Sequence, residues 1–434
     1  MAVNTEILQL PPGPNLPRLI NGAWLFARPA DFFRAIERRH GPVAHVKLPG
    51  FGDVVLITDP ELIKQVYLNP DEAYAGEASK VMGPVLGPHS VLLLDGAEHM
   101  RQRKLMLPPF HGESLRGYEQ SIREIATREI AAWPRGKTFA VRPRSQSITL
   151  QVILKVIFGV EDPARRDRYS RAVDRLMSVS NLLALNTRAD GEISRWSPAR
   201  MIESRRRAVD DLIFEDLADR RGNPLPGATD VLSLLLAARD DEGDPMTDAE
   251  LRDELVTLVF AGHETTATAI AWAADLLAWN PEVQERATRA ATGDDTEYLD
   301  ALVNETLRIR PVVWSTGRIV QRSLQLGNWR IPAGFRLWSP MTNLAANRSV
   351  YPEPERFDPG RFIGATPPAY AWIPFGGGIR RCIGAAFAQL EMRVVLQEML
   401  RAGQLHPAGK RPERQQMRAV TLAPQHGARV RMTS

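Results

Sequence analysis

The stretch Phe375–Gly384, FGGGIRRCIG, contains Cys382, the only cysteine among 434 residues. A lone cysteine makes no internal disulfide, so it is an inert buried residue, a reactive thiol or a metal ligand. Arg380 and Arg381 precede it, and such charges lower a thiol pKa. The next segment, AAFAQLEMRVVLQEMLRA, has helical apolar spacing, which places the cysteine at a helix N-terminus, where an anion is favoured. The three glycines let a large flat group approach the backbone. A plain structural turn is the alternative.

Composition and charge indicate an ordinary globular protein. Hydrophobic residues make up 44% of the chain, and 55 Lys and Arg against 51 Asp and Glu leave a net charge of +4. This near-balance does not suggest nucleic acid as a partner. A single cysteine is typical of a reducing compartment, and we find no secretory signal and no run of about 18 apolar residues. We therefore expect a cytoplasmic protein without a membrane span.

Periodicity predicts a mainly α protein with small β-sheets, an α+β class, and we expect one domain over residues 1–434. The proline-rich residues 1–28 predict an extended lead-in without a helix. Alternating apolar residues predict a β-hairpin over 43–58, and residues 71–94 suggest a long loop. Residues 96–243 are predominantly helical in pattern. Two further strand pairs are expected, 324–331 with 335–339 and 420–422 with 428–432.

The longest predicted helix opens at a capping box, formed by Thr247 and Glu250, and continues without proline to Asn280. It is about 50 Å long at 1.5 Å per residue. In its interior the sequence AGHETT contains Glu264 and Thr265, and an acid buried there is costly unless something uses it. The small residues before them predict a local gap or kink. A satisfied polar patch between helices is the alternative.

A second charged group predicts a structural ion pair. Glu305 and Arg308, in NETLRIRP, are three residues apart and so lie on one face of a helix. A buried pair needs additional hydrogen-bonding partners, and Arg356, in PEPERF, is our candidate for the third member. We expect this group to act as scaffold and not in catalysis.

A third group supplies donors for an anion. His99 and Arg103 are four residues apart on one helical face, and with Arg318 and Arg380 they make a set suited to two carboxylates, because arginine binds carboxylates in a fork. Any one of these residues alone is more typical of a protein surface. The prediction therefore depends on the whole set.

With these motifs in place, the chain resembles the cytochrome P450 family. FGGGIRRCIG is similar to its haem-binding loop, AGHETT to its central-helix motif, ETLR to its Glu-x-x-Arg, PERF to its meander motif and HMRQR to its His-x-x-x-Arg. The five motifs follow the family's order, and the resemblance covers nearly the entire chain. Two departures are minor: Asn347 stands where many members have His, and Glu264 where many bacterial members have Asp.

The resemblance implies a haem-thiolate monooxygenase that hydroxylates or epoxidises a hydrophobic small molecule such as a fatty acid, terpenoid or steroid. It implies haem b (iron protoporphyrin IX) as cofactor, O2 as co-substrate, and electrons from NAD(P)H through a ferredoxin or flavodoxin and its reductase. A monomeric, bacterial, soluble member is expected. Arg381 is expected to face an acidic electron donor.

The resemblance also assigns roles to individual residues. Cys382 is the metal ligand, and Glu264 and Thr265 are the catalytic proton relay. The cofactor-binding residues are His99, Arg103, Arg318, Phe375, Arg380, Cys382 and Gly384. The substrate pocket is expected to include Val85, Leu86, Phe260, Ala261, Val312, Val313, Trp314 and Leu422. These pocket residues are mostly apolar, which fits a hydrophobic guest.

Four other readings stay open from the sequence. A peroxide-driven peroxygenase of the same fold usually replaces the acid and alcohol by an arginine-bearing motif, and an isomerase or dehydratase usually lacks the alcohol. A haem-thiolate protein that only binds or senses ligand keeps Cys382 without needing Thr265. A cysteine hydrolase is the last alternative, because it uses the thiol without any haem.

Overall fold

The structure is a computed structural model that describes residues 10–180, 198–225, 227–418 and 421–434. The helices are α1 (Arg18–Ala27), α2 (Pro29–His40), α3 (Pro60–Leu68), α4 (Gly76–Ser79), α5 (Gly83–Leu86), α6 (Gly96–Met106), α7 (Gly112–Ala131), α8 (Val141–Phe158), α9 (Pro163–Ser180), α10 (Pro198–Gly222), α11 (Val231–Ala237), α12 (Asp248–Trp279), α13 (Pro281–Thr292), α14 (Thr296–Ile309), α15 (Met341–Ala345) and α16 (Ala385–Ala402). The strands are β1 (Val43–Leu48), β2 (Gly52–Ile57), β3 (Ala73–Tyr74), β4 (Thr138–Ala140), β5 (Ser315–Val320), β6 (Leu324–Leu326), β7 (Trp329–Ile331), β8 (Arg336–Pro340), β9 (Gln404–Pro407), β10 (Gln415–Arg418), β11 (Thr421–Pro424) and β12 (Arg429–Thr433). This mixture confirms the predicted mainly α class with small sheets.

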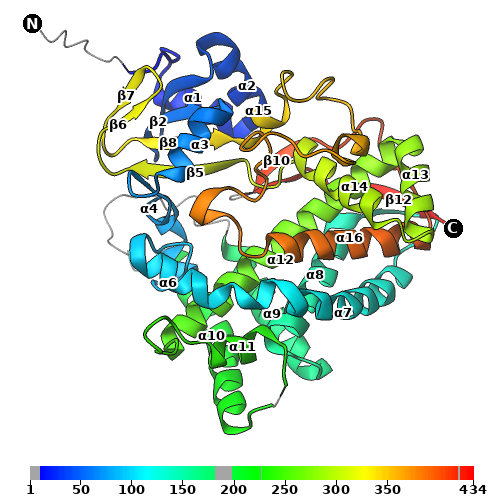
Figure 1. Cartoon of the computed structure of the whole chain (residues 1–434). Coiled ribbons are helices and arrows are strands. Elements are labelled where there is room, and N and C mark those ends of the chain that lie inside the picture. Colours follow the sequence, from blue (N-terminus) through cyan, green and yellow to red (C-terminus); the bar gives the residue numbers. More distant parts are fainter. Residues whose placement is uncertain (1–9, 181–197, 226, 419–420) are drawn as a thin grey trace, which may run out of the picture.

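The main sheet lies at one side of the molecule with α1 and α2, and helices fill the rest (Figure 1). Its strand order is β1-β2-β8-β5-β3. The predicted hairpin of β1 and β2 is confirmed, with Val43 opposite Ile57. β8 pairs with β2 in parallel and with β5 in antiparallel orientation, so the first and the last thirds of the chain share one sheet.

The central helix α12 follows its prediction closely. Thr247 accepts from the Glu250 N–H, and the Glu250 side chain accepts from the Thr247 N–H, so the capping box is present. The helix ends at Trp279, before Pro281. Most of its residues are buried, including the fully enclosed Trp272. α12 packs on α8 and crosses behind α16 in Figure 1.

The prediction of a lead-in without a helix is wrong for residues 18–27, which form α1. The prolines end at Pro17, and the following residues bury Asn21 and Leu25 against the rest of the domain. The Asn21 side chain donates to the Lys47 carbonyl at 3.2 Å, which ties the helix to β1. Burial of one helix face therefore outweighs the irregular character of the proline-rich start.

Residues 71–94 are not a continuous loop, because they contain β3, α4 and α5. The predicted pair 324–331 with 335–339 is also wrong. The turn forms earlier, at Gly327 with φ of 57°, so β6 pairs with β7 inside the first stretch, while β8 joins the main sheet.

The predicted C-terminal strand pair is wrong too. β11 pairs with β10, and β12 pairs with β4 and β9. Val420, which the prediction placed in the first of these strands, lies outside the described residues. β11 pairs with the strand before it and β12 with two strands from earlier in the chain. Alternation of apolar residues indicates a strand but does not identify its partner.

Within the described ranges, no helix combines the length and apolar character that crossing a lipid bilayer requires.

Candidate functional site

The cysteine loop is a tight turn at the start of α16. The Cys382 N–H donates to the Phe375 carbonyl at 2.9 Å, which closes the loop. Gly376 and Gly378 have φ of 69° and 60°, values that side chains rarely adopt. A Cβ on Gly378 would lie 2.4 Å from the Tyr67 carbonyl oxygen. The glycines are therefore needed for the shape of the turn and for its close packing on α3.

The Cys382 side chain keeps accessible surface although it lies deep in the protein. Burial raises the pKa of the Cys382 thiol, whereas a hydrogen bond from the Gly384 N–H and the charges of Arg103 and Arg381 lower this pKa. The expected effect of neighbouring positive charge is therefore present, but burial outweighs it. A thiol that is both accessible and buried faces an internal space and not the outer surface.

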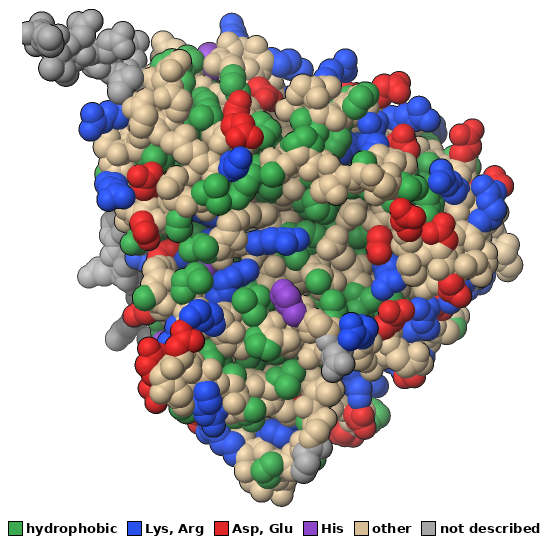
Figure 2. All heavy atoms as spheres, viewed as in Figure 1, with side chains coloured by type: hydrophobic (Ala, Val, Ile, Leu, Met, Phe, Trp, Pro, Cys, Tyr) green, Lys and Arg blue, Asp and Glu red, His purple; other side chains and the backbone are tan. Residues whose placement is uncertain are grey.

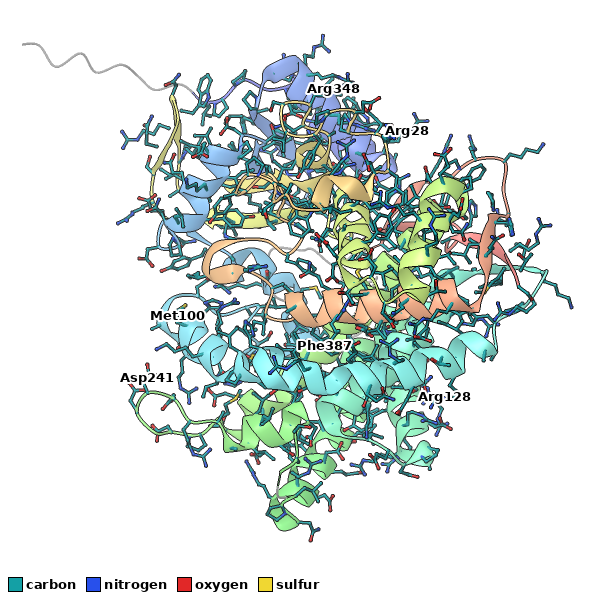
Figure 3. All side chains as sticks on the ribbon, turned by 45° about the vertical axis from the view of Figure 1, so that its right-hand side comes forward. Arg28, Met100, Arg128, Asp241, Arg348 and Phe387 are labelled. Carbon is teal, nitrogen blue, oxygen red and sulfur yellow. The ribbon has the colours of Figure 1, made fainter. Side chains whose placement is uncertain are left out.

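The loop is held by packing on both sides. Phe375 is half-buried and makes an edge contact with Trp372, with ring centroids 6.4 Å apart. On α16, Phe387 lies in an edge arrangement with Tyr118 of α7 at 5.8 Å, and Figure 3 shows it between these two helices. These contacts fix the start of α16 and hence the position of the sulfur.

The four predicted donors gather in one place. Burial, followed by the charges of Arg380, Arg103 and Arg318, lowers the pKa of His99 to about 3. His99 is 1% exposed, and its Nδ1 has no hydrogen-bond partner among the described residues. No hydrogen bond or ion pair within the described ranges holds Arg103. Three like charges beside a buried imidazole make a site for an anion.

Arg380 already has partners in the chain. It forms an ion pair with Asp95 and donates to the carbonyls of Val91, at 3.0 Å, and Leu94. Burial lowers the pKa of Arg380 to about 10, while Asp95 raises it. Arg318 lies over the Tyr67 ring, with 4.6 Å between its guanidinium carbon and the ring centroid. The two arginines border a cavity of about 350 Å³ beside the start of α6.

These residues fit a cofactor that carries carboxylates and a thiolate-binding metal. Among the described residues, the buried Nδ1 of His99 has no hydrogen-bond partner and the half-buried Arg103 guanidinium has no ion-pair partner, so both are left to interact with a bound group. The Gly384 N–H already donates to the sulfur, as it would to a bound thiolate. In the part of the chain that is described, no cluster of three or more His, Cys, Asp or Glu residues could hold a metal by itself.

On α12 the predicted acid and alcohol lie in the helix interior, and both are half-buried. The Thr265 hydroxyl donates to the Ala261 carbonyl at 2.6 Å. Glu264 accepts from Gln146 at 2.6 Å and forms an ion pair with Arg142. Both partners lie on α8, more than a hundred residues earlier. Sequence reasoning missed them, because nothing local to either segment indicates that pairing.

The residues predicted for the substrate pocket differ in their exposure. Phe260 and Val313 are half-buried, and Ala261 is exposed to the space beside α12. Val85, Leu86 and Leu422 are completely buried and Val312 nearly so, so these four have little or no surface to present to a guest. Trp314 packs in the sheet core, stacked on Phe33 at 5.9 Å and against Trp338.

Both backbone polar groups of Leu422 are hydrogen-bonded inside the core. Its carbonyl accepts from the Trp272 ring N–H at 2.8 Å, and its N–H donates to the Val312 carbonyl at 2.7 Å. The β10–β11 hairpin is thereby tied to α12 and to the segment before β5.

The predicted ion pair of Glu305 and Arg308 is present and buried, with bonds of 2.6 and 2.8 Å. The third member is wrong. Arg356 contributes only its backbone carbonyl, at 3.3 Å from Arg308, and its side chain is exposed beside Glu353. Arg361 faces the pair instead, 3.6 Å from Glu305. The signal was available in the sequence, because a second Arg-Phe follows five residues after the first.

Comparisons with known proteins agree with this geometry. The sequence model of the family described as Cytochrome P450 matches residues 11–431. "Putative cytochrome P450 135B1" of Mycobacterium tuberculosis is 40% identical over 99% of this chain and 92% of that protein. "Putative cytochrome P450 137" of the same species is 37% identical over 97% of this chain and 90% of that protein.

Two solved structures share the fold. The structure titled "Retinoic acid bound cyanobacterial CYP120A1" has a TM-score of 0.84 and 25% identity, covering 98% of this chain and 100% of that one. The structure titled "Crystal structure of cytochrome P450DA heme domain" has a TM-score of 0.88 and 22% identity, covering 99% and 98%. Proteins of this family are typically haem monooxygenases. The match over nearly the full length, together with the cysteine loop and the cationic cluster, shows that the chain belongs to the cytochrome P450 family.

Proposed function

We propose that this protein is a haem-thiolate monooxygenase that inserts one oxygen atom into a hydrophobic small molecule, with electrons supplied from outside the chain. The observation that supports this proposal is the accessible Cys382 sulfur beside a buried cationic cluster. The two are close together, because the charge of Arg103 lowers the pKa of both His99 and Cys382. Bound haem with a cysteine thiolate ligand supplies an iron centre that favours O–O cleavage. Cys382 would ligate the iron, and His99, Arg103, Arg318 and Arg380 would hold the two propionates.

The protein's own groups have distinct tasks in the proposed reaction. For hydroxylation the balance is R–H + O2 + 2 electrons + 2 protons giving R–OH + H2O. The electrons come from NAD(P)H through a ferredoxin or flavodoxin and its reductase. Glu264 holds and passes protons, and the Thr265 hydroxyl directs them toward oxygen. Phe260, Ala261 and Val313 exclude water and orient the substrate.

The electron donor would bind where the cysteine comes nearest to the surface. Arg381 is exposed there. Figure 2 shows a group of Lys and Arg side chains near the centre of this face, over the segment before α16 and over α6. An acidic donor is therefore the partner that this surface favours.

An elongated apolar acid is the first substrate class to test. The neighbour titled as bound to retinoic acid is 25% identical to this chain, and Phe260 and Val313, which are half-buried, are apolar. Retinoic acid, dodecanoic acid, testosterone and geraniol form a suitable panel, read by the low-to-high-spin shift of the haem.

The function itself is tested on the purified holoenzyme. We expect the red-shifted Soret band of a reduced carbonyl complex of a haem thiolate, and its absence overturns the proposal in favour of a cysteine hydrolase. Thr265→Ala should keep the haem and lower ferredoxin-driven product formation by about 10- to 100-fold, with more oxygen released as hydrogen peroxide. Thr292→Ala, an exposed threonine on α13, is the matched control. Unchanged product formation by Thr265→Ala would instead favour a protein without the relay, and equal turnover with peroxide alone would favour a peroxygenase.

A further inference from the structure

The acid on α12 is turned toward α8. One Glu264 oxygen accepts from the Gln146 amide at 2.6 Å, and the other is paired with Arg142. The neighbouring Thr265 hydroxyl is engaged with the Ala261 carbonyl on its own helix. The acid is therefore positioned by a different helix from the one that carries it.

Behind Gln146 lies a polar cleft of about 450 Å³ between α7, α8, α9 and α12. Figure 3 labels Arg128 on α7, one of the residues of its wall. The charged side chains that line it are Arg128, Glu129, Arg166, Asp167 and Asp174. Polar walls of this kind and a volume many times that of one water molecule make the cleft a place for ordered water.

Two residues of the inner wall lie next to Glu264: Gln146 hydrogen-bonds to it, and His263 precedes it in the chain. Gln146 borders the cleft and also donates to Glu264. His263 borders it as well, is 3% exposed and is held by Thr149, with 3.0 Å between the hydroxyl and Nδ1. Burial lowers the pKa of His263, which favours the neutral form of the imidazole. Among the described residues that line the cleft, Gln146 is the one whose side chain hydrogen-bonds to Glu264.

We propose that the cleft between α8 and α9 admits the protons that the reaction consumes, and that Gln146 is the positioning residue that connects the cleft to Glu264. The inference rests on the proposed function, since each O2 cleaved takes up two protons that must come from solvent. Water in the cleft delivers a proton to the Glu264 carboxylate where Gln146 holds it, and the acid passes it on toward Thr265. Arg142 keeps the carboxylate oriented toward the cleft between turnovers.

The experiment uses the haem-loaded enzyme with a plant-type ferredoxin and its reductase at saturating concentration. Oxygen consumption is measured in H2O and in D2O, which needs no identified substrate because uncoupled reduction, O2 + 2 electrons + 2 protons giving H2O2, draws on the same protons. A positioned proton donor is worth about 10²- to 10⁴-fold, so displacing it without removing it should slow the reaction on the order of tenfold. Gln146→Leu should show this loss and a larger solvent isotope effect than the parent.

Matched variants separate the proton role from general damage. Gln120→Leu makes the same change on the surface of α7, where the amide donates to Glu124, and should match the parent. Gln146→Asn, which shortens the side chain by one methylene, should give an intermediate isotope effect and guards against misfolding of the leucine variant. Ser170→Trp places an indole in the cleft and should slow oxygen consumption without touching Glu264.

Peroxide-driven oxidation of guaiacol provides the second readout, since hydrogen peroxide brings its own protons. It should be unchanged in every variant. If Gln146→Leu has the parent's rate and isotope effect, or if Ser170→Trp leaves both unchanged, the entrance is not this cleft. Equal loss of the peroxide-driven activity would show a structural role and would also overturn the inference. A normal carbonyl spectrum in these variants leaves the proposed function standing in either case.

Discussion

Replacing Glu305 by Gln removes the carboxylate that, among the described residues, neutralises the buried Arg308 guanidinium. Glu305 is 0% and Arg308 2% exposed, and their two hydrogen bonds are 2.6 and 2.8 Å long. A third donor, the Asp358 N–H, lies 2.9 Å from the same carboxylate. A neutral amide cannot accept from all three, and it turns an N–H2 group toward Arg308. Breaking a buried pair at one partner costs about 3–5 kcal/mol, a large part of the roughly 5–15 kcal/mol that holds a domain folded.

The two arginines of the meander provide the matched pair for this measurement. Arg361→Ala removes a side chain that faces Glu305 at 3.6 Å and donates to the Glu353 carbonyl at 2.8 Å, so it should cost about 1–2 kcal/mol. Arg356→Ala removes an exposed side chain and should stay within about 0.5 kcal/mol.

Urea denaturation of the three variants, followed by far-UV circular dichroism, gives the free energies of unfolding. Haem content is measured in parallel, because binding of a cofactor to the folded state adds to its stability. A loss below about 1 kcal/mol for Glu305→Gln, or equal losses for the two arginine variants, would refute the structural reasoning.

Two further predictions concern charge. Glu391 is wholly buried on α16, neither of its oxygens has a hydrogen-bond partner in the described part of the chain, and burial raises its pKa well above the usual value. The unfolded carboxyl therefore ionises first, and this residue lowers the free energy of unfolding as pH rises above about 4.3. Glu391→Gln should gain stability over the parent in urea titrations, more at about pH 8 than at about pH 5, and a gain independent of pH would contradict this account. Arg381→Glu should be reduced by its ferredoxin on the order of tenfold more slowly at low salt in stopped-flow measurements, with a smaller difference at high salt; reduction as fast as in the parent would argue against docking at this face.

Features set by local chemistry were predictable from the sequence. The capping box at Thr247 and the proline at residue 281 bound α12, because each acts on backbone groups within a few residues. The four donors were predicted as a set, and the structure brings them together. Three arginines around one buried imidazole favour an anion there.

Features set by distant packing were not predictable in the same way. Arg142 and Gln146 meet Glu264 only because α8 lies against α12. Leu422 is apolar and was predicted to line the substrate pocket. In the structure, its carbonyl accepts a hydrogen bond from the Trp272 ring N–H, and the residue is buried in the core. The mistaken choice of Arg356 over Arg361 has another origin. A short 3-10 turn over Pro359–Phe362 decides which arginine points back toward Glu305.

The glycine in AGHETT has the opposite effect from the one its sequence suggests. A small residue in a helix predicts a gap, yet a Cβ on Gly262 would lie 2.5 Å from the Ile153 side chain. The missing side chain therefore lets α8 approach α12 closely. Ala261, about 100° away around the helix, is exposed and faces open space. The two small residues thus serve different surfaces, one closing the contact that brings Arg142 and Gln146 to the acid, and the other keeping room beside Thr265. The contacts of Glu264 therefore depend on the distance between the backbones of α8 and α12. That distance is set by the side chains of both helices, so neither segment alone predicts it.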